Sequence, residues 1–386
     1  MSKARDIADL GGVTTRLDQV GNSDGALSNR NMVLNGSMVV AQRGDQTGVT
    51  ANETYFVDRF FYSGVDEGTW SLTQSTDVPS GSGFTKSAKL EITTADASME
   101  GPDFAQLRYK VENQDIKHIL KGTANAKELT LSFWVKSSLA QGFKFRLREN
   151  HSATSRQIIK AYTVATSNTW QKEVITFAGD TGGDDFSGAT DTSSSFILEW
   201  MLGGSTDYQG GTASGNWEDF DSTKFDATDT FLTTVNSTFY ITGVQLEVGD
   251  TATPFEHISY GDQLQKCQRY LYAINAKGHP SSTSSAYARF ISFAQGANAV
   301  IWFPQYPVQM RALPSLIATN VSSSTFQMFN YNAQALVSLT GISQAEGTQT
   351  TGQVVFTTAS GINVGHMVSV RWNNSPNASF QFDAEL

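Results

Sequence analysis

Residues 129–137, LTLSFWVKS, decide the fold class of this chain. Apolar residues stand at positions 129, 131, 133 and 135, and residues 130, 132, 134 and 136 separate them. An extended chain turns alternate side chains to opposite faces, so this pattern predicts a half-buried β-strand. Residues 142–149, GFKFRLRE, repeat the alternation, with Phe and Leu between Lys144, Arg146 and Arg148.

The same period of two recurs through most of the chain and makes it an all-β protein. Further runs stand near residues 56–62, 87–93, 104–111, 157–164, 170–177, 195–202 and 238–248, separated by Gly, Ser, Asn and Asp clusters. Strands joined by such turns indicate an antiparallel sandwich or jelly roll over residues 31–258. After a Ser/Gly loop, eight more candidate strands predict a C-terminal β-sandwich over residues 276–386.

A short helical connector is predicted between these domains, over residues 259–275. Leu264, Cys267 and Leu271 are spaced three and four residues apart, as on one stripe of a helix. In an oligomer this stripe would sit against its copies near the axis. The stripe would otherwise pack on its own domain, and one heptad does not decide between these arrangements.

Composition and charge exclude several classes of protein. The chain has 386 residues, 17% charged, with a net charge of −10. Residues 31–260 carry 17 bases and 29 acids, whereas residues 261–386 carry 6 bases and 4 acids. The sequence shows no basic patch of the kind that a nucleic-acid binder needs. It has no apolar run long enough to span a membrane and, with one cysteine, no intramolecular disulfide.

Residues 1–30 are predicted to be a docking segment that orders against a partner. Residues 4–10 could form about two helical turns with Ile7 and Leu10 on one side as anchors, followed by a polar linker. A frayed terminus explains the same composition equally well.

An acidic, glycine-rich stretch after residue 179 is the best candidate for a cation site. Asp180, Asp184 and Asp185 lie close together in the sequence, and carboxylate oxygens suit calcium. The spacing does not match an EF-hand, and a solvated acidic loop is the alternative. The GNSDG string at 21–25 matches a nucleophile-elbow pattern, but it stands in a polar linker instead of between a strand and a helix.

Aromatic residues in the C-terminal domain are candidates for binding carbohydrate, because sugar rings dock on aromatic planes beside polar groups. Trp302 and Tyr306 stand beside two prolines in WFPQYP, and Trp372 and Asn373 stand at a strand-to-turn transition. Burial in the core is the alternative for each of the aromatic residues.

Several ordered strings resemble a family of phage tail-fibre proteins found in phages of marine bacteria and cyanobacteria. The family opening is similar to NRNMVLNGSM at 29–38 with AQRG at 41–44, followed by FVDRF at 56–60 and LTLSFWVKS at 129–137. The closing strings are YITGVQLEVG at 240–249, ATPFEH at 252–257, SYG at 259–261 and CQRY at 267–270. Ile258 departs from the Arg that family members commonly have there.

The resemblance implies a tail fibre or receptor-binding protein with a central jelly roll like that of carbohydrate-binding modules. It implies a homotrimer that is made in the host cytoplasm and carried on the virion tail. The N-terminal segment would dock on a tail or baseplate protein, and the C-terminal domain would contact a host glycan such as lipopolysaccharide O-antigen or capsule. Three weak sites on each fibre would give firm attachment.

We therefore expect a non-enzymatic protein that needs no cofactor, apart from the calcium considered above. Two other functions remain open: a purely structural virion protein, and a polysaccharide depolymerase. A monomeric lectin-like module is a further alternative, which the solution mass would distinguish.

Overall fold

The computed structural model describes residues 30–65, 68–96, 98–150, 155–225, 230–275, 290–319, 326–372 and 379–386. The chain forms two compact units. The N-terminal unit comprises Met1–Gln263 together with Leu386, and the C-terminal unit comprises Leu264–Glu385.

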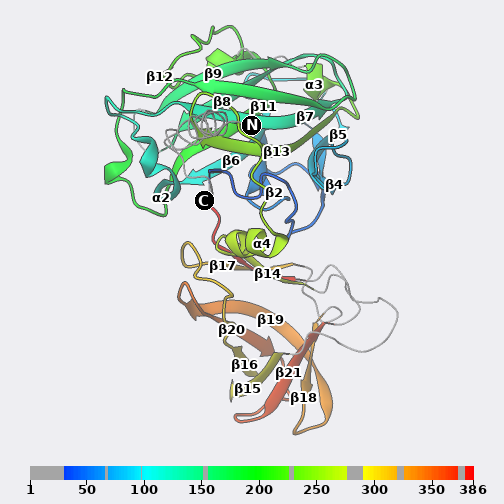
Figure 1. The fold of residues 1–386 in the computed structure, drawn as a ribbon. Helices are drawn as coiled ribbons and strands as arrows, with labels where there is room; N and C mark the ends of the chain where they lie inside the picture. The colour runs from blue at the N-terminus through cyan, green and yellow to red at the C-terminus, as the bar shows by residue number, and fades with distance from the viewer. Residues whose placement is uncertain are drawn as a thin grey trace, which may run out of the picture. The chain divides into compact units, whose positions relative to one another are not determined.

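The N-terminal unit consists of two antiparallel sheets (Figure 1). Sheet A has the order β1 (Gln46–Val49), β4 (Thr69–Ser75), β5 (Ser87–Thr94), β13 (Thr238–Val248), β7 (Leu129–Ser137) and β10 (Gln171–Phe177). Sheet B has the order β12 (Glu218–Asp219), β9 (Arg156–Thr163), β8 (Gly142–Glu149), β11 (Ser194–Gly204), β6 (Phe104–Glu112), β3 (Phe60–Val65) and β2 (Thr54–Tyr55).

Short helices connect these strands. They are α2 (Asn113–Ile116), η1 (Lys117–Ile119), η2 (Phe186–Gly188), η3 (Thr206–Tyr208), η4 (Ser222–Phe225) and α3 (Thr230–Thr233). In the described part of the chain, no helix is long and apolar enough to cross a membrane.

The inner faces of the two sheets meet in one aromatic core. Phe133 of β7 comes from sheet A, and Phe145 of β8 and Trp200 of β11 come from sheet B. The Trp200 ring centroid lies 5.8 Å from that of Phe133 and 5.0 Å from that of Phe145. All three side chains are fully buried, and burying one such side chain contributes about 1.5–3 kcal/mol. The alternation in the sequence therefore holds: the apolar residues of these strands face inward.

Hydrogen bonds join the start of the N-terminal unit to its end. The backbone N–H of Asn31 donates to Oε2 of Glu256 at 3.1 Å, and its side-chain amide donates to the carbonyl of Val244 at 3.0 Å. The buried amide of Asn35 donates to the carbonyl of Asp58 at 3.0 Å. We call these five residues the clasp. Each comes from one of the strings that resemble tail-fibre proteins, so in this chain those strings include residues that close the sandwich.

Gly36 shows how tightly the clasp is built. A Cβ atom at this position would lie 2.0 Å from the carbonyl oxygen of Val244. Because that oxygen belongs to the backbone of β13, a larger residue would push the opening segment away from the strand.

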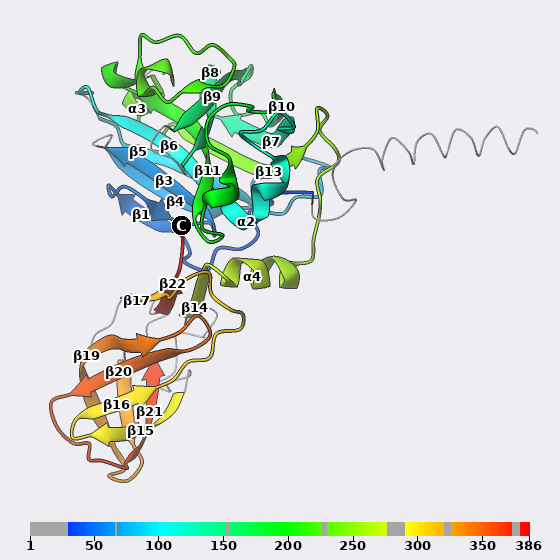
Figure 2. The same ribbon diagram turned by 90° about the vertical axis from the view of Figure 1, so that its left-hand side faces the viewer.

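In the C-terminal unit, six of the described strands close into a barrel (Figure 2). The order around the barrel is β15 (Phe290–Gly296), β16 (Ala299–Trp302), β20 (Gly352–Thr358), β19 (Ala335–Gly347), β18 (Phe326–Asn330) and β21 (Met367–Trp372). Sheet C has the order β14 (Leu271–Asn275), β22 (Ser379–Asp383) and β17 (Ser315–Thr319). The all-β prediction is confirmed; strand patterns alone do not distinguish a barrel from a sandwich.

The predicted helical connector is half helix and half strand. Helix α4 covers Tyr260–Gln268, and β14 follows at once and pairs with β22, Leu271 standing opposite Asp383. The prediction of one helix stripe through Leu264, Cys267 and Leu271 is therefore wrong at its last position. Cys267 and Leu271 are buried within their own chain, and Leu264 is half-buried. The C-terminal unit consequently begins before the predicted residue 276.

Candidate functional site

The outer face of sheet B, turned away from the core, brings together charged residues from three strands. β11 runs between β6 and β8, and Glu199 of β11 stands opposite both Arg108 of β6 and Arg146 of β8. Arg148 follows two residues along β8 and so points to the same face. We call Arg108, Arg146, Arg148 and Glu199 the arginine cluster.

The carboxylate of Glu199 lies close to all three arginines of this cluster. Nε of Arg146 donates to Oε2 of Glu199, Nε of Arg108 lies 2.9 Å from Oε1, and Nε of Arg148 lies 3.6 Å from Oε1. Glu199 is fully buried and Arg146 nearly so, while the side chains of Arg108 and Arg148 are 14% and 20% exposed. The cluster carries a net charge of about +2, because arginine stays protonated in proteins.

The arginines determine the protonation state of Glu199. Burial alone raises the pKa of a carboxyl group, but the charges of Arg146, Arg108 and Arg148 outweigh burial and hold the pKa of Glu199 at about 2. Burial lowers the pKa of Arg146 to about 10, against the attraction of Glu199. Glu199 is therefore ionised at neutral pH and has no proton to give as a general acid.

Aromatic side chains from residues 208–225 lie over the arginine cluster. The guanidinium carbon of Arg146 lies 4.0 Å from the ring centroid of Phe225 and 4.8 Å from that of Phe220. The Phe220 ring also lies 5.2 Å from the guanidinium carbon of Arg148, and Phe220 remains 39% exposed. Phe225 is buried against Met201, with Tyr208 packed beside them.

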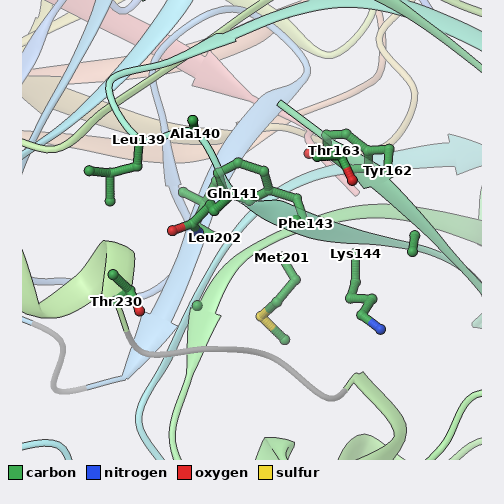
Figure 3. Close-up of a pocket in the computed structure, with 13 residues that line it drawn as sticks. Leu139, Ala140, Gln141, Phe143, Lys144, Tyr162, Thr163, Met201, Leu202 and Thr230 are labelled. Carbon is green, nitrogen blue, oxygen red and sulfur yellow. The ribbon is translucent and has the colours of Figure 1, made fainter. Parts of the chain in front are cut away.

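A cavity of about 520 Å³ opens on the same unit at the ends of β8, β9 and β11 (Figure 3). Lys144 and Met201 stand opposite each other on β8 and β11, and their side chains lie side by side in its lining. Ala161 and Thr163 of β9 and Thr230 of α3 complete this outer-face part of the wall. Met201 of this wall also packs against Phe225, which covers Arg146 of the arginine cluster.

Asp180, Asp184 and Asp185, which were predicted to bind calcium, lie beside a lysine side chain. Nζ of Lys121 lies 3.0 Å from a carboxylate oxygen of Glu149 and 3.4 Å from one of Asp180, and it donates to the carbonyl of Asp184 at 2.9 Å. The side chain of Asp185 accepts instead from Ser187 at the start of η2. Among the described residues, no group of three or more His, Cys, Asp or Glu side chains is placed to hold a metal.

The predicted carbohydrate-binding aromatics of the C-terminal unit pack inward. Trp302 is half-buried, its ring centroid 4.1 Å from that of Phe290. Tyr306 is buried, 5.0 Å from Phe382, and its hydroxyl lacks a hydrogen-bond partner. Both belong to the core packing of this unit.

Other predicted residues fall outside what the structure describes. Asn373 and the side chain of Trp372 lie outside the described residues. So do the predicted anchors Ile7 and Leu10.

The arginine cluster was visible in the sequence only in part. Lys144, Arg146 and Arg148 alternate along one predicted strand, which places three cations on one face. The alternation alone gave no sign that Glu199 and Arg108 would stand beside them. Only the pairing of β11 with β6 and β8, which are distant from it in the sequence, shows that these residues are neighbours.

Comparisons with known proteins gave solved structures but no family. No protein-family model and no curated protein matches this chain. One solved structure is the enzymatically active domain of tailspike protein 4 of bacteriophage CBA120, 15% identical over 57% of this chain with a TM-score of 0.29. This chain covers 22% of that tailspike chain.

Other matches are sugar-binding proteins of bacteria. A family 11 carbohydrate-binding module from a Clostridium thermocellum cellulase is 12% identical over 54% of this chain and 97% of that module, with a TM-score of 0.28. A putative sugar-binding protein from Bacteroides thetaiotaomicron is 10% identical over 57% of this chain and all of its own length, with a TM-score of 0.31. At these TM-scores we draw no function from the likenesses and argue it from the residues of this chain.

Proposed function

We propose that this chain is a phage tail fibre or receptor-binding protein that attaches the virion to a cell-surface glycan without cleaving it. The observation that carries glycan binding is the cavity of about 520 Å³ at the ends of β8, β9 and β11, in the same unit as the arginine cluster. Concave sites with a few fixed polar groups and an apolar wall suit small ligands such as sugars. The strings in residues 29–270 support the tail-fibre role.

This proposal moves the glycan site from the C-terminal unit to the N-terminal one. Trp302 and Tyr306 pack into the C-terminal core, whereas the outer face of sheet B offers arginine side chains and an exposed ring. The homotrimer, the docking of residues 1–30 on a tail or baseplate protein, and location on the virion remain parts of the proposal. In a trimer, three weak glycan sites act together.

Binding to purified bacterial O-antigen and capsular polysaccharides, measured by biolayer interferometry on the full chain, tests the proposal. Ala161→Trp places a large ring in the cavity wall and should abolish binding. Thr176→Trp puts the same ring on an exposed position of β10 in sheet A and should leave binding unchanged. Binding by wild type that Ala161→Trp does not weaken would place the site elsewhere.

The same samples separate the alternatives. We expect the bound polysaccharide to keep its chain length after incubation, measured by size-exclusion chromatography. Shortened chains would indicate a depolymerase. A full chain that binds none of the polysaccharides would favour a purely structural virion protein.

A further inference from the structure

The arginine cluster holds more positive charge than its paired carboxylates neutralise among the residues that the structure describes. Three guanidinium groups face the single carboxylate of Glu199. Acidic side chains of the segment that covers the cluster are engaged elsewhere: Glu218 pairs with Lys224 at 2.6 Å, and Asp219 lies 3.5 Å from Arg156. Among the described residues, an excess charge of about +2 therefore remains in the cluster, which a ligand carboxylate would reduce.

Hydrogen-bonding capacity is also left over at this place. Nε of Arg148 is buried and has no hydrogen-bond partner in the described part of the chain, although it lies 3.6 Å from Glu199. A buried donor without an acceptor costs about 1–3 kcal/mol. Because the side chains of Arg108 and Arg148 are part-exposed, a ligand can reach them.

Phe220 adds an apolar surface beside these cations. Its ring lies over the guanidinium groups of Arg146 and Arg148, and 39% of the residue stays exposed. A planar guanidinium matches a carboxylate with two parallel hydrogen bonds. An exposed ring beside it matches the apolar face of a sugar.

We propose that the outer face of sheet B binds sugars that carry a carboxylate, such as uronic acids. Arg108 and Arg148 face the carboxylate, and Phe220 faces the sugar ring. This inference rests on the proposed glycan-binding function and names the class of glycan.

The surrounding charge sets a limit on the ligand. Residues 31–260 carry 12 more acids than bases, so the unit as a whole repels polyanions. Screening confines charge effects to about 10 Å at 0.1 M salt. The cluster therefore favours single carboxylate groups on a sugar over densely sulfated or phosphorylated chains.

Galacturonic acid, a single sugar with one carboxylate, is a suitable probe, because its methyl ester has the same sugar ring without the charge. We expect the full-length protein to bind the acid at least about ten times more tightly than the ester, the size of one charge-assisted hydrogen bond. Dextran sulfate should bind more weakly than the acid. Equal affinity for acid and ester, or no binding of the acid, overturns the inference.

Single substitutions test which residues cause the preference for the acid over its ester. Arg148→Gln should remove most of the preference, and Arg148→Lys should retain part of it because the charge stays while the planar geometry is lost. Phe220→Ser should weaken the binding of both the acid and the ester. Lys172→Gln, which removes an exposed cation from sheet A, is the matched control and should bind as wild type does.

The outcomes distinguish this inference from the proposed function. A preference for the acid that Arg148→Gln leaves intact, in a variant that melts at the wild-type temperature, contradicts the inference. Neutral polysaccharides bound in the cavity and lost in Ala161→Trp would leave the proposed function standing while overturning the acidic class. Failure to bind any polysaccharide would overturn both.

Discussion

The outer face of sheet B and the outer face of the barrel differ in the kind of residue that they present. Sheet B carries the arginine cluster, three cations around a buried carboxylate. The strands of the barrel contain two charged residues, Glu346 and Arg371.

Apolar side chains take the place of charge on the barrel. Phe293 is 64% exposed and stands between Met367 of β21 and Ile301 of β16. Ile291 on the same strand is 62% exposed, and Leu336 on β19 is 57% exposed. Phe293 and Ile291 lie on the same face of β15, and neighbouring exposed apolar side chains are typical of interaction surfaces. A face with few charges also meets its own copy with little like-charge repulsion, whereas the arginine cluster of sheet B would repel its copy.

The two units therefore suit different partners. Sheet B has charge to neutralise and a cavity beside it, which fits a small polar ligand. The barrel has apolar area to cover, which fits another protein surface. Three measurements test this contrast.

The largest effect should come from Glu199→Gln, which removes the single negative charge of the arginine cluster. Leaving buried cations unpaired costs about 3–5 kcal/mol, and we expect that loss in the free energy of unfolding by urea. Glu346→Gln, an exposed carboxyl on the barrel, should change it by less than about 0.5 kcal/mol. Equal effects of the two substitutions would show that the cluster is no more desolvated than the barrel surface.

Lowering the pH should remove a similar contribution to the free energy of unfolding. The folded pKa of Glu199 is about 2 against an ordinary value of 4.5, so its ionised form stabilises the fold above pH 4.5. That stability is lost as the pH falls from 4.5 through 2, and the shift corresponds to roughly 3 kcal/mol. Unfolding free energies measured from pH 6 to pH 2 should show the gap between wild type and Glu199→Gln narrowing. A gap that stays constant with pH contradicts the pKa assigned to Glu199.

The smallest effect on stability, within about 0.5 kcal/mol, should come from Phe293→Ser on the barrel. Its effect on assembly should be clear: light scattering should give wild type a mass well above the 41.9 kDa of one chain and the variant a lower one. Val174→Ser, an exposed apolar residue on sheet A, is the control and should keep the wild-type mass. An unchanged mass for Phe293→Ser would exclude this face from self-association.

The sequence predicted the fold better than the sites, for physical reasons. Period-two alternation is local, so strands such as β7 and β8 could be identified from residues 129–137 and 142–149 alone. Barrel closure and the place of β14 depend on pairing with strands far along the chain. Residues 271–275 read as the end of a helix until β22 is known to lie beside them.

Functional residues were hardest to predict where their contacts come from residues distant in the sequence. Asp180 and Asp184 looked like ligands for calcium, but Lys121, about 60 residues earlier, supplies the positive charge. Trp302 and Tyr306 looked like a sugar platform, but Phe290 and Phe382 cover them. In each case the side-chain type indicated which kind of group it binds. Only the folded structure showed which residue of the chain provides that group.

The clasp also has a mechanical meaning. Because Asn31 bonds Glu256, the chain enters and leaves the N-terminal unit at nearly one point. A pull on the chain from both sides of the unit therefore loads the bonds of Asn31 first, which join it to Glu256 and to β13 of sheet A. The unit can transmit tension while sheet B, and any ligand on it, carries little of the load.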